Sequence, residues 1–154
     1  FKRWQNSCSV ALRRDNKRME GLLDDSVAIK VSSTKSREFG KKNMLDESEE
    51  TCWYSKEGTP QFIIVDFKQR VALAEVDIMF QGGFAGKTTS LQVLDSNEWR
   101  EVCPLHPDDV NDLQVFAMEK EEEGQVFRLL FEDSTDFFGR LVVYKLKMRG
   151  KKLE

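Results

Sequence analysis

The chain has 154 residues and a net charge of -3, with 24 basic and 27 acidic residues interspersed along it. This length is enough for one domain that buries roughly two-thirds of the surface of the unfolded chain. The even mixture of charges excludes a basic nucleic-acid footprint, so we expect no direct nucleic-acid partner. No apolar run approaches the roughly 20 residues of a membrane span, and we expect none.

The cysteines are few and widely spaced. Cys8, Cys52 and Cys103 are an odd number and form no CxxC pair, which argues against a disulfide framework and against a zinc knuckle. We therefore expect buried, reduced thiols at Cys52 and Cys103, an intracellular protein, and no cofactor.

Residues 1–25 differ from the rest and form a basic N-terminal extension. The spacing of Leu12, Met19, Leu22 and Leu23 predicts a short amphipathic helix. The basic run at 13–18 is either a solvated arm or a nuclear import signal. We expect this extension to dock on a partner or on the domain's own surface, and residues 151–154 to form a short basic tail.

Strand patterns fill residues 26–150. Trp53 follows an acidic turn, and its large apolar ring predicts a core position. The run at 61–67 is apolar on nearly every side chain, which predicts a central strand covered on both faces. Further strands are predicted at 27–31, 74–80, 90–95, 99–103, 112–118, 126–131 and 141–148. About eight strands without helical crossovers indicate an antiparallel jelly-roll β-sandwich.

Catalytic motifs are missing from the sequence. The stretch from Gly82 to Thr88 ends like a phosphate-binding loop, but Gln81 stands where that motif requires its first glycine. His106 is the only histidine and has no nucleophile signature beside it. We therefore predict that the protein is not an enzyme.

Four blocks of residues, in order, resemble the discoidin, or coagulation-factor type C, domains of the galactose-binding-like fold. They are Glu38-Phe39-Gly40-Lys41-Lys42, then Asp46 with Glu49-Glu50-Thr51-Cys52-Trp53, then Phe80-Gln81-Gly82-Gly83-Phe84, and finally Phe131 to Arg140. The similarity covers residues 26–150. Within the family it is strongest to a small intracellular branch associated with a nuclear receptor.

The resemblance implies an eight-stranded jelly roll without enzymatic activity that binds its ligands through loops at one end. At the matching positions we expect a partner-binding surface made of aromatic tips with cations beside them: Phe39, Lys41, Phe84, Lys87, Phe137, Phe138 and Arg140. Exposed aromatic residues rimmed by cations suit protein recognition. The alternative is that Phe137 or Phe138, and Phe84 as well, fold back as a plug of the core.

The sequence and the family resemblance support three functional hypotheses. The first is an intracellular interaction module of the nucleus and cytoplasm that resembles a nuclear-receptor-associated repressor and binds a protein partner. A structural subunit of a large cytoskeletal or ciliary assembly fits the same residues, with the cilium as its location. A carbohydrate-binding lectin is the alternative from a different class.

A calcium site is the weaker alternative at the acidic turn. Family members that bind calcium or sugar use an acidic residue and a hydroxyl where Asp46 and Thr51 stand, together with a glutamate where this chain has Lys145. An ammonium group there would repel a divalent cation. We predict that millimolar calcium leaves the thermal stability unchanged. Thermal stabilisation by calcium that is abolished by Asp46→Ala would contradict this.

Overall fold

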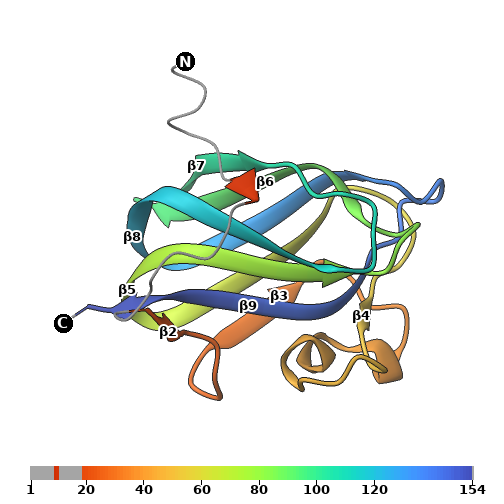
Figure 1. Cartoon of the computed structure of the whole chain (residues 1–154), viewed down its shortest axis with the longest axis horizontal. Helices are drawn as coiled ribbons and strands as arrows, with labels where there is room; N and C mark the ends of the chain where they lie inside the picture. The colour runs from red at the N-terminus through yellow and green to blue at the C-terminus, as the bar shows by residue number, and fades with distance from the viewer. Residues whose placement is uncertain (1–8, 11–18, 154) are drawn as a thin grey trace.

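The computed structural model describes residues 9–10 and 19–153, and it shows two layers of antiparallel strands facing each other (Figure 1). This confirms the predicted all-β sandwich. The strands are β1 (Ser9–Val10), β2 (Glu20–Gly21), β3 (Ala28–Val31), β4 (Trp53–Tyr54), β5 (Gln61–Phe80), β6 (Gly86–Asp95), β7 (Glu98–Leu105), β8 (Leu113–Ser134) and β9 (Val142–Lys152). Two short 3-10 helices, η2 (Arg37–Phe39) and η3 (Lys41–Leu45), lie between β3 and β4.

The long strands β5 and β8 pair with each other along nearly their whole length, from Gln61 opposite Phe131 to Met79 opposite Leu113. Each of them covers two of the predicted strands. The polar residues after Phe67 suggest a turn, but the chain continues through an irregular pairing in which Lys68 has a φ of 64°. The ribbon of β5 and β8 therefore passes from one layer into the other.

The first layer consists of β3, the first half of β5, the second half of β8, β6 and β7. The second contains the first half of β8, the second half of β5, and β9, with β1 beside β8 and with β2 and β4 beside β9. The core lies between the layers. Trp53 is fully buried there, and its indole Nε1 donates a hydrogen bond to the carbonyl of Ser33 at 2.9 Å. The predicted core position of Trp53 is confirmed.

The outer side of the first half of β5 differs from the prediction. Ile63, Val65 and Phe67 are buried between the layers, but Phe62 and Ile64 on the other side of the strand are only half-buried. The strand is therefore covered fully on one face only. Its apolar outer residues belong to a sheet face that is partly open to solvent.

The chain termini also differ from their predicted boundaries. Residues 1–8 and 11–18, which hold the basic run and Leu12, lie outside the described residues. Where the predicted helix would end, Glu20 and Gly21 form a strand against β9, and Leu22 belongs to the core. At the other end β9 continues through Lys152, so the first half of the predicted basic tail, Lys151 and Lys152, is part of the sheet.

The cysteine prediction is half confirmed. Cys52 is a free, buried thiol, and burial raises its pKa because the apolar surroundings disfavour the thiolate. The expected free thiol at Cys103 is wrong, because Cys103 is disulfide-bonded. An odd number of cysteines argues against a framework in which all are paired, but it does not exclude one disulfide.

Candidate functional site

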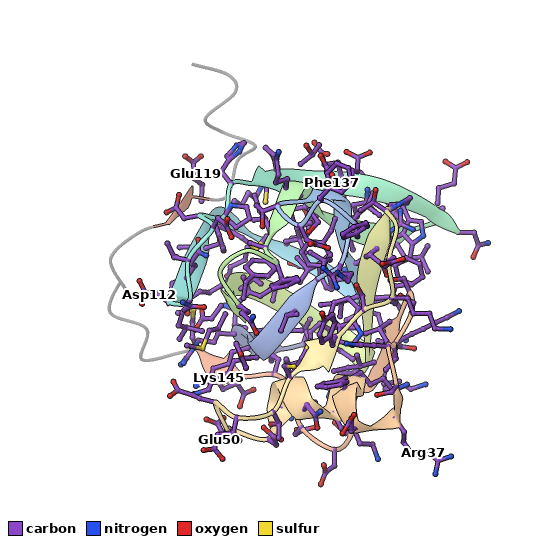
Figure 2. All side chains as sticks on the ribbon, turned by 90° about the vertical axis from the view of Figure 1, so that its right-hand side faces the viewer. Arg37, Glu50, Asp112, Glu119, Phe137 and Lys145 are labelled. Atoms are coloured by element: carbon purple, nitrogen blue, oxygen red, sulfur yellow. The ribbon has the colours of Figure 1, made fainter. Side chains whose placement is uncertain are left out.

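The loops at one end of the sandwich bring distant parts of the chain together. This end contains the segment with η2 and η3, the short strand β4, the loop at 81–85 and the connection from β8 to β9. Figure 2 faces this end, with Phe137 near its top and Arg37 and Glu50 near its bottom. The predicted binding residues lie on these segments.

Aromatic rings and cations form a continuous row across this end, which we call the loop-end row. Its members, in spatial order, are Lys35, Phe39, Tyr54, Phe84, Arg140, Phe138 and Phe137. The Phe39 and Tyr54 rings meet edge-on with centroids 5.3 Å apart, and the Tyr54 and Phe84 centroids are 6.0 Å apart. Edge-to-face contacts and cation–π contacts stabilise such an arrangement.

Arg140 joins the two halves of the loop-end row. Its guanidinium lies 5.3 Å from the ring centroid of Phe84 and 5.3 Å from that of Phe138. Phe138 in turn meets Phe137 at a centroid distance of 5.2 Å and an interplanar angle of 90°. The five predicted aromatic and arginine positions therefore come together in the fold.

Exposure decides between a binding tip and a core plug. The side chain of Phe137 is 94% exposed and that of Phe138 is 54% exposed, whereas Phe39, Tyr54 and Phe84 are half-buried. The core-plug alternative is therefore wrong for Phe137 and Phe138. Two large apolar side chains point into solvent at the tip, supported by rings that are partly packed.

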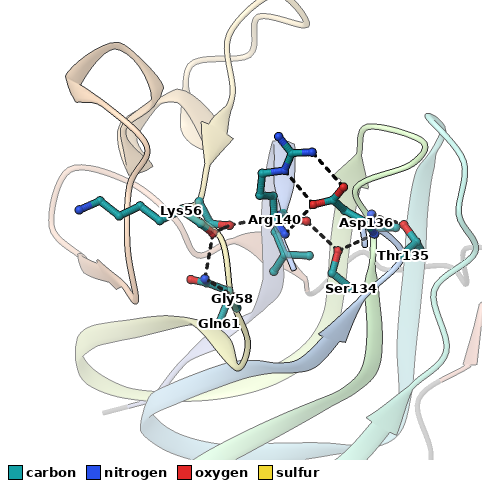
Figure 3. A network of polar contacts seen from close by, with 10 residues as sticks. Lys56, Gly58, Gln61, Ser134, Thr135, Asp136 and Arg140 are labelled. Carbon is teal, nitrogen blue, oxygen red and sulfur yellow. Dashed lines mark hydrogen bonds and ion pairs between the residues drawn. The ribbon is translucent and has the colours of Figure 1, made fainter. Parts of the chain in front are cut away.

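Backbone contacts hold the tip of the loop outward. The carbonyl of Phe138 accepts a hydrogen bond from Gly58 N at 2.8 Å. Gly139 has a φ of +79°, and a Cβ there would lie 2.9 Å from the backbone of Gly58. Only glycine fits such a close approach in the left-handed region. The loop is thus pressed against the segment that precedes β5 (Figure 3).

A doubled ion pair closes the same loop. The Arg140 Nε donates to Asp136 Oδ2 at 2.8 Å, a terminal nitrogen of Arg140 donates to Asp136 Oδ1 at 3.0 Å, and Arg140 N also donates to Oδ2 at 3.0 Å. Ser134 Oγ donates to the Arg140 carbonyl at 2.7 Å and accepts from Asp136 N at 3.0 Å. Figure 3 shows this network at the base of the loop. The two phenylalanines are therefore carried by a braced loop between β8 and β9.

The neighbouring loop at 81–85 is fixed by side chains from the loop before β8. Gly82 N donates to Asn111 Oδ1 and Gly83 N donates to Asp109 Oδ1, each at 2.7 Å. Thr135 Oγ1 accepts from Ala85 N at 2.9 Å and donates to Asp109 Oδ1 at 3.1 Å. These bonds connect the loop of Phe84 directly to the loop of Phe137.

The remaining predicted cations lie outside the row. Lys41 begins η3 and Lys87 lies on β6, and both are exposed. Conversely, Lys35 and Tyr54 were not predicted from the sequence, although the Lys35 ammonium lies 4.4 Å from the Tyr54 ring centroid. The sequence carried one signal for Tyr54. It follows the core residue Trp53, and neighbouring strand residues point to opposite sides of a sheet, so Tyr54 should point away from the core.

The acidic turn makes internal contacts. Asp46 accepts from Thr51 Oγ1 at 2.5 Å and from Ser48 N at 3.0 Å. These bonds, chiefly that from Thr51, lower the pKa of Asp46, and the charge of Lys145 adds to the effect. The Lys145 ammonium pairs with Glu49 at 3.7 Å. Within the described part of the chain no His, Cys, Asp and Glu residues form a group of three suited to a metal ion. The calcium prediction stays a prediction.

We predict that Asp136→Asn destabilises the fold at neutral pH by about 1.5–3 kcal/mol, the range for hydrogen bonds to charged groups. The hydrogen bonds from Arg140 lower the pKa of Asp136 in the folded state. Its stabilising contribution is therefore complete above the unfolded value of about 3.9 and is lost as the pH falls through the lower folded value. Urea unfolding at neutral pH and at decreasing pH below about 4 measures this.

The expected result is that the difference between wild type and Asp136→Asn is largest at neutral pH and shrinks on acidification. Asp112→Asn, at an exposed position, is the matched control and should change stability by less than about 0.5 kcal/mol. A difference that is absent at neutral pH, or that grows on acidification, would contradict the assigned ion pair.

Three comparisons with known proteins agree with this geometry. The family model "F5/8 type C domain" matches residues 28–141. The "Nuclear receptor 2C2-associated protein" of Danio rerio is 42% identical over 137 residues, which is 86% of this chain and 97% of the relative. The protein of the same name from Homo sapiens is 36% identical over 80% of this chain and 88% of its own length.

Solved structures show the same fold at low identity. The family 32 CBM of C. perfringens NanJ, solved in complex with galactose, has a TM-score of 0.73 at 12% identity and covers 85% of this chain and 98% of its own. A fucolectin from Morone saxatilis serum has a TM-score of 0.67 at 13% identity, covering 84% of this chain and 47% of its own. By its family model and its relatives, this chain belongs to the F5/8 type C, or discoidin, domain family.

Proposed function

We propose that the chain is a non-catalytic protein-interaction module that binds a macromolecular partner through the loop-end row. The observation that supports this most strongly is the exposure of Phe137 and Phe138, at 94% and 54%, on a loop braced by the Asp136–Arg140 pair. Exposed aromatic clusters on a soluble domain are costly to leave open and are typical of recognition surfaces.

The bracing matters for affinity because a partner does not have to order the loop. The loop between β8 and β9 is tied to Gly58 and to the 81–85 loop through hydrogen bonds that involve Phe138 and Thr135. A preorganised loop loses little conformational entropy on binding, so more of the contact energy remains as affinity. Phe137 and Phe138 would be the anchors, with Phe84 as their support.

The charged side chains around the loop-end row indicate which kind of partner surface it would bind. Arg140 is already paired with Asp136, so it positions the rings, while the exposed Lys35, Lys41 and Lys87 carry the free positive charge around the row. Such rim cations raise the association rate with an acidic partner more than they raise the affinity. We propose an apolar partner surface with acidic residues at its rim.

The name shared by the relatives supports a specific partner class, a nuclear receptor related to nuclear receptor 2C2. With that partner we place the protein in the nucleus and cytoplasm. A subunit of a cytoskeletal or ciliary assembly would use the same surface. A lectin is the second candidate, since the NanJ module of like fold holds galactose and Phe137 offers an open ring face.

We predict that the double variant Phe137→Ala/Phe138→Ala weakens binding to purified nuclear receptor 2C2 at least tenfold, as expected for aromatic anchors. Calorimetric titration measures the affinity, and thermal melts show that the fold is retained. Leu94→Ala removes an exposed apolar side chain from β6, outside the loop-end row, and is the control that should leave receptor binding unchanged.

Unchanged receptor affinity in the phenylalanine variant would refute the proposed surface. If the wild-type chain binds no receptor but binds galactose, and the variant does not, the same row serves the lectin function and the protein-partner proposal fails.

A further inference from the structure

The outer face of the first layer is apolar and lies away from the loop-end row. Residues that pair directly on neighbouring strands point to the same side of a sheet. Gln92 on β6 pairs with Arg128 on β8 and with Glu101 on β7, so these three side chains form one row on the outer face. The half-buried or exposed apolar side chains beside them are Phe62, Ile64, Leu94, Trp99, Val126 and Leu130.

Arg128 lies in the middle of this face without an opposite charge. Its Nε donates to Gln92 Oε1 at 2.6 Å, and its guanidinium lies 4.4 Å from the ring centroid of Trp99. It forms no ion pair with any residue in the described part of the chain. Partial burial lowers the pKa of Arg128, because its apolar surroundings disfavour the charge. A carboxylate supplied from outside would satisfy this group.

Glu101 is the complementary charge on the same face. It is exposed on the edge strand β7 and makes no ion pair within residues 9–10 and 19–153. Arg128 and Glu101 are separated by β6 alone, which puts their backbones about 10 Å apart. They form no pair within the chain because the Arg128 guanidinium packs on the Trp99 ring and its Nε donates to Gln92. Their backbones are placed symmetrically on either side of β6.

From this arrangement we infer that the outer face of the first layer binds a second copy of this chain, related by a two-fold axis that runs along β6. Such an axis places the β8 of one copy over the β7 of the other. Arg128 of each copy then faces Glu101 of its partner, and two reciprocal ion pairs form. A self-complementary patch of this kind is what a two-fold interface requires.

The apolar residues obey the same symmetry. Leu94 on β6 lies near the axis and faces its own copy, while Trp99 on β7 faces Val126 on β8. The strands of the two facing sheets run in nearly the same direction, as in the aligned packing of β-sheets, which cross at about 30°. Trp and Arg are the residue types enriched among interface anchors. This inference does not rest on the proposed function at the loop end.

Sedimentation equilibrium of the purified chain over a range of concentrations tests the inference. We expect a monomer–dimer equilibrium for the wild type. Arg128→Glu and Glu101→Arg should each weaken the dimer at least tenfold, since each places like charges opposite one another. The double variant Arg128→Glu/Glu101→Arg swaps the charges and should restore dimerisation to near the wild-type level.

Two controls keep this result specific. Lys30→Glu changes the net charge as Arg128→Glu does, and it lies on β3, beyond the predicted overlap, so it should leave the dimer intact. Phe137→Ala/Phe138→Ala should also leave it intact, which separates this test from that of the loop end. A monomeric wild type overturns the inference. So does a dimer unaffected by the single variants, or a folded charge-swap variant that stays monomeric.

Discussion

The doubled ion pair between Asp136 and Arg140 is the interaction on which the loop end depends. It closes the connection between β8 and β9, and it holds the Arg140 guanidinium between the rings of Phe84 and Phe138. A charged pair that is bidentate has a defined geometry, unlike a single lysine contact. The exposed phenylalanines are therefore presented in one orientation, and the loops from three parts of the chain become one surface.

The sandwich supplies the rigid base for that surface. The ribbon of β5 and β8 belongs to both layers, so one continuous pairing connects the core around the buried Trp53 with the loop end. Hydrogen bonds from the backbone of Gly82 and Gly83 to side chains before β8 extend this rigidity into the loops. Binding at such an end needs little reorganisation of the domain.

Two faces of different chemistry result from this arrangement. The loop-end row offers projecting rings with lysines around them, which suits a larger partner with an acidic rim. The outer face of the first layer is flatter and carries Arg128 and Glu101 on either side of β6, which suits a second copy of the chain. Because the two faces do not share a residue, dimerisation would double the number of loop ends and leave each of them open.

Much of the fold followed from the sequence, and particular residues show why the rest did not. Alternating apolar residues predicted the strands, and the burial of Trp53 was predicted from its size. The continuation of β5 past Lys68 was missed, because three polar residues in a row resemble a turn when the pairing partner is unknown. The disulfide of Cys103 and the strand at Glu20 depend on long-range contacts that no local pattern encodes.

The candidate site was predicted to a similar extent. The resemblance placed Phe39, Phe84, Phe137, Phe138 and Arg140 at one end, and the structure brings them together. It could not show that Tyr54 and Lys35 complete the row, nor that Phe137 points outward, because these depend on the packing of three separate loops. Lys41 and Lys87, which were also expected in the site, lie outside the loop-end row.

Amide hydrogen exchange of the chain, free and bound to purified nuclear receptor 2C2, is the most direct measurement of the central claim. We expect added protection in the segments 35–39, 82–85 and 134–140, with no change on β6 and β7 relative to the free chain. Protection confined to other segments, or a complex that leaves residues 134–140 unprotected, would contradict it.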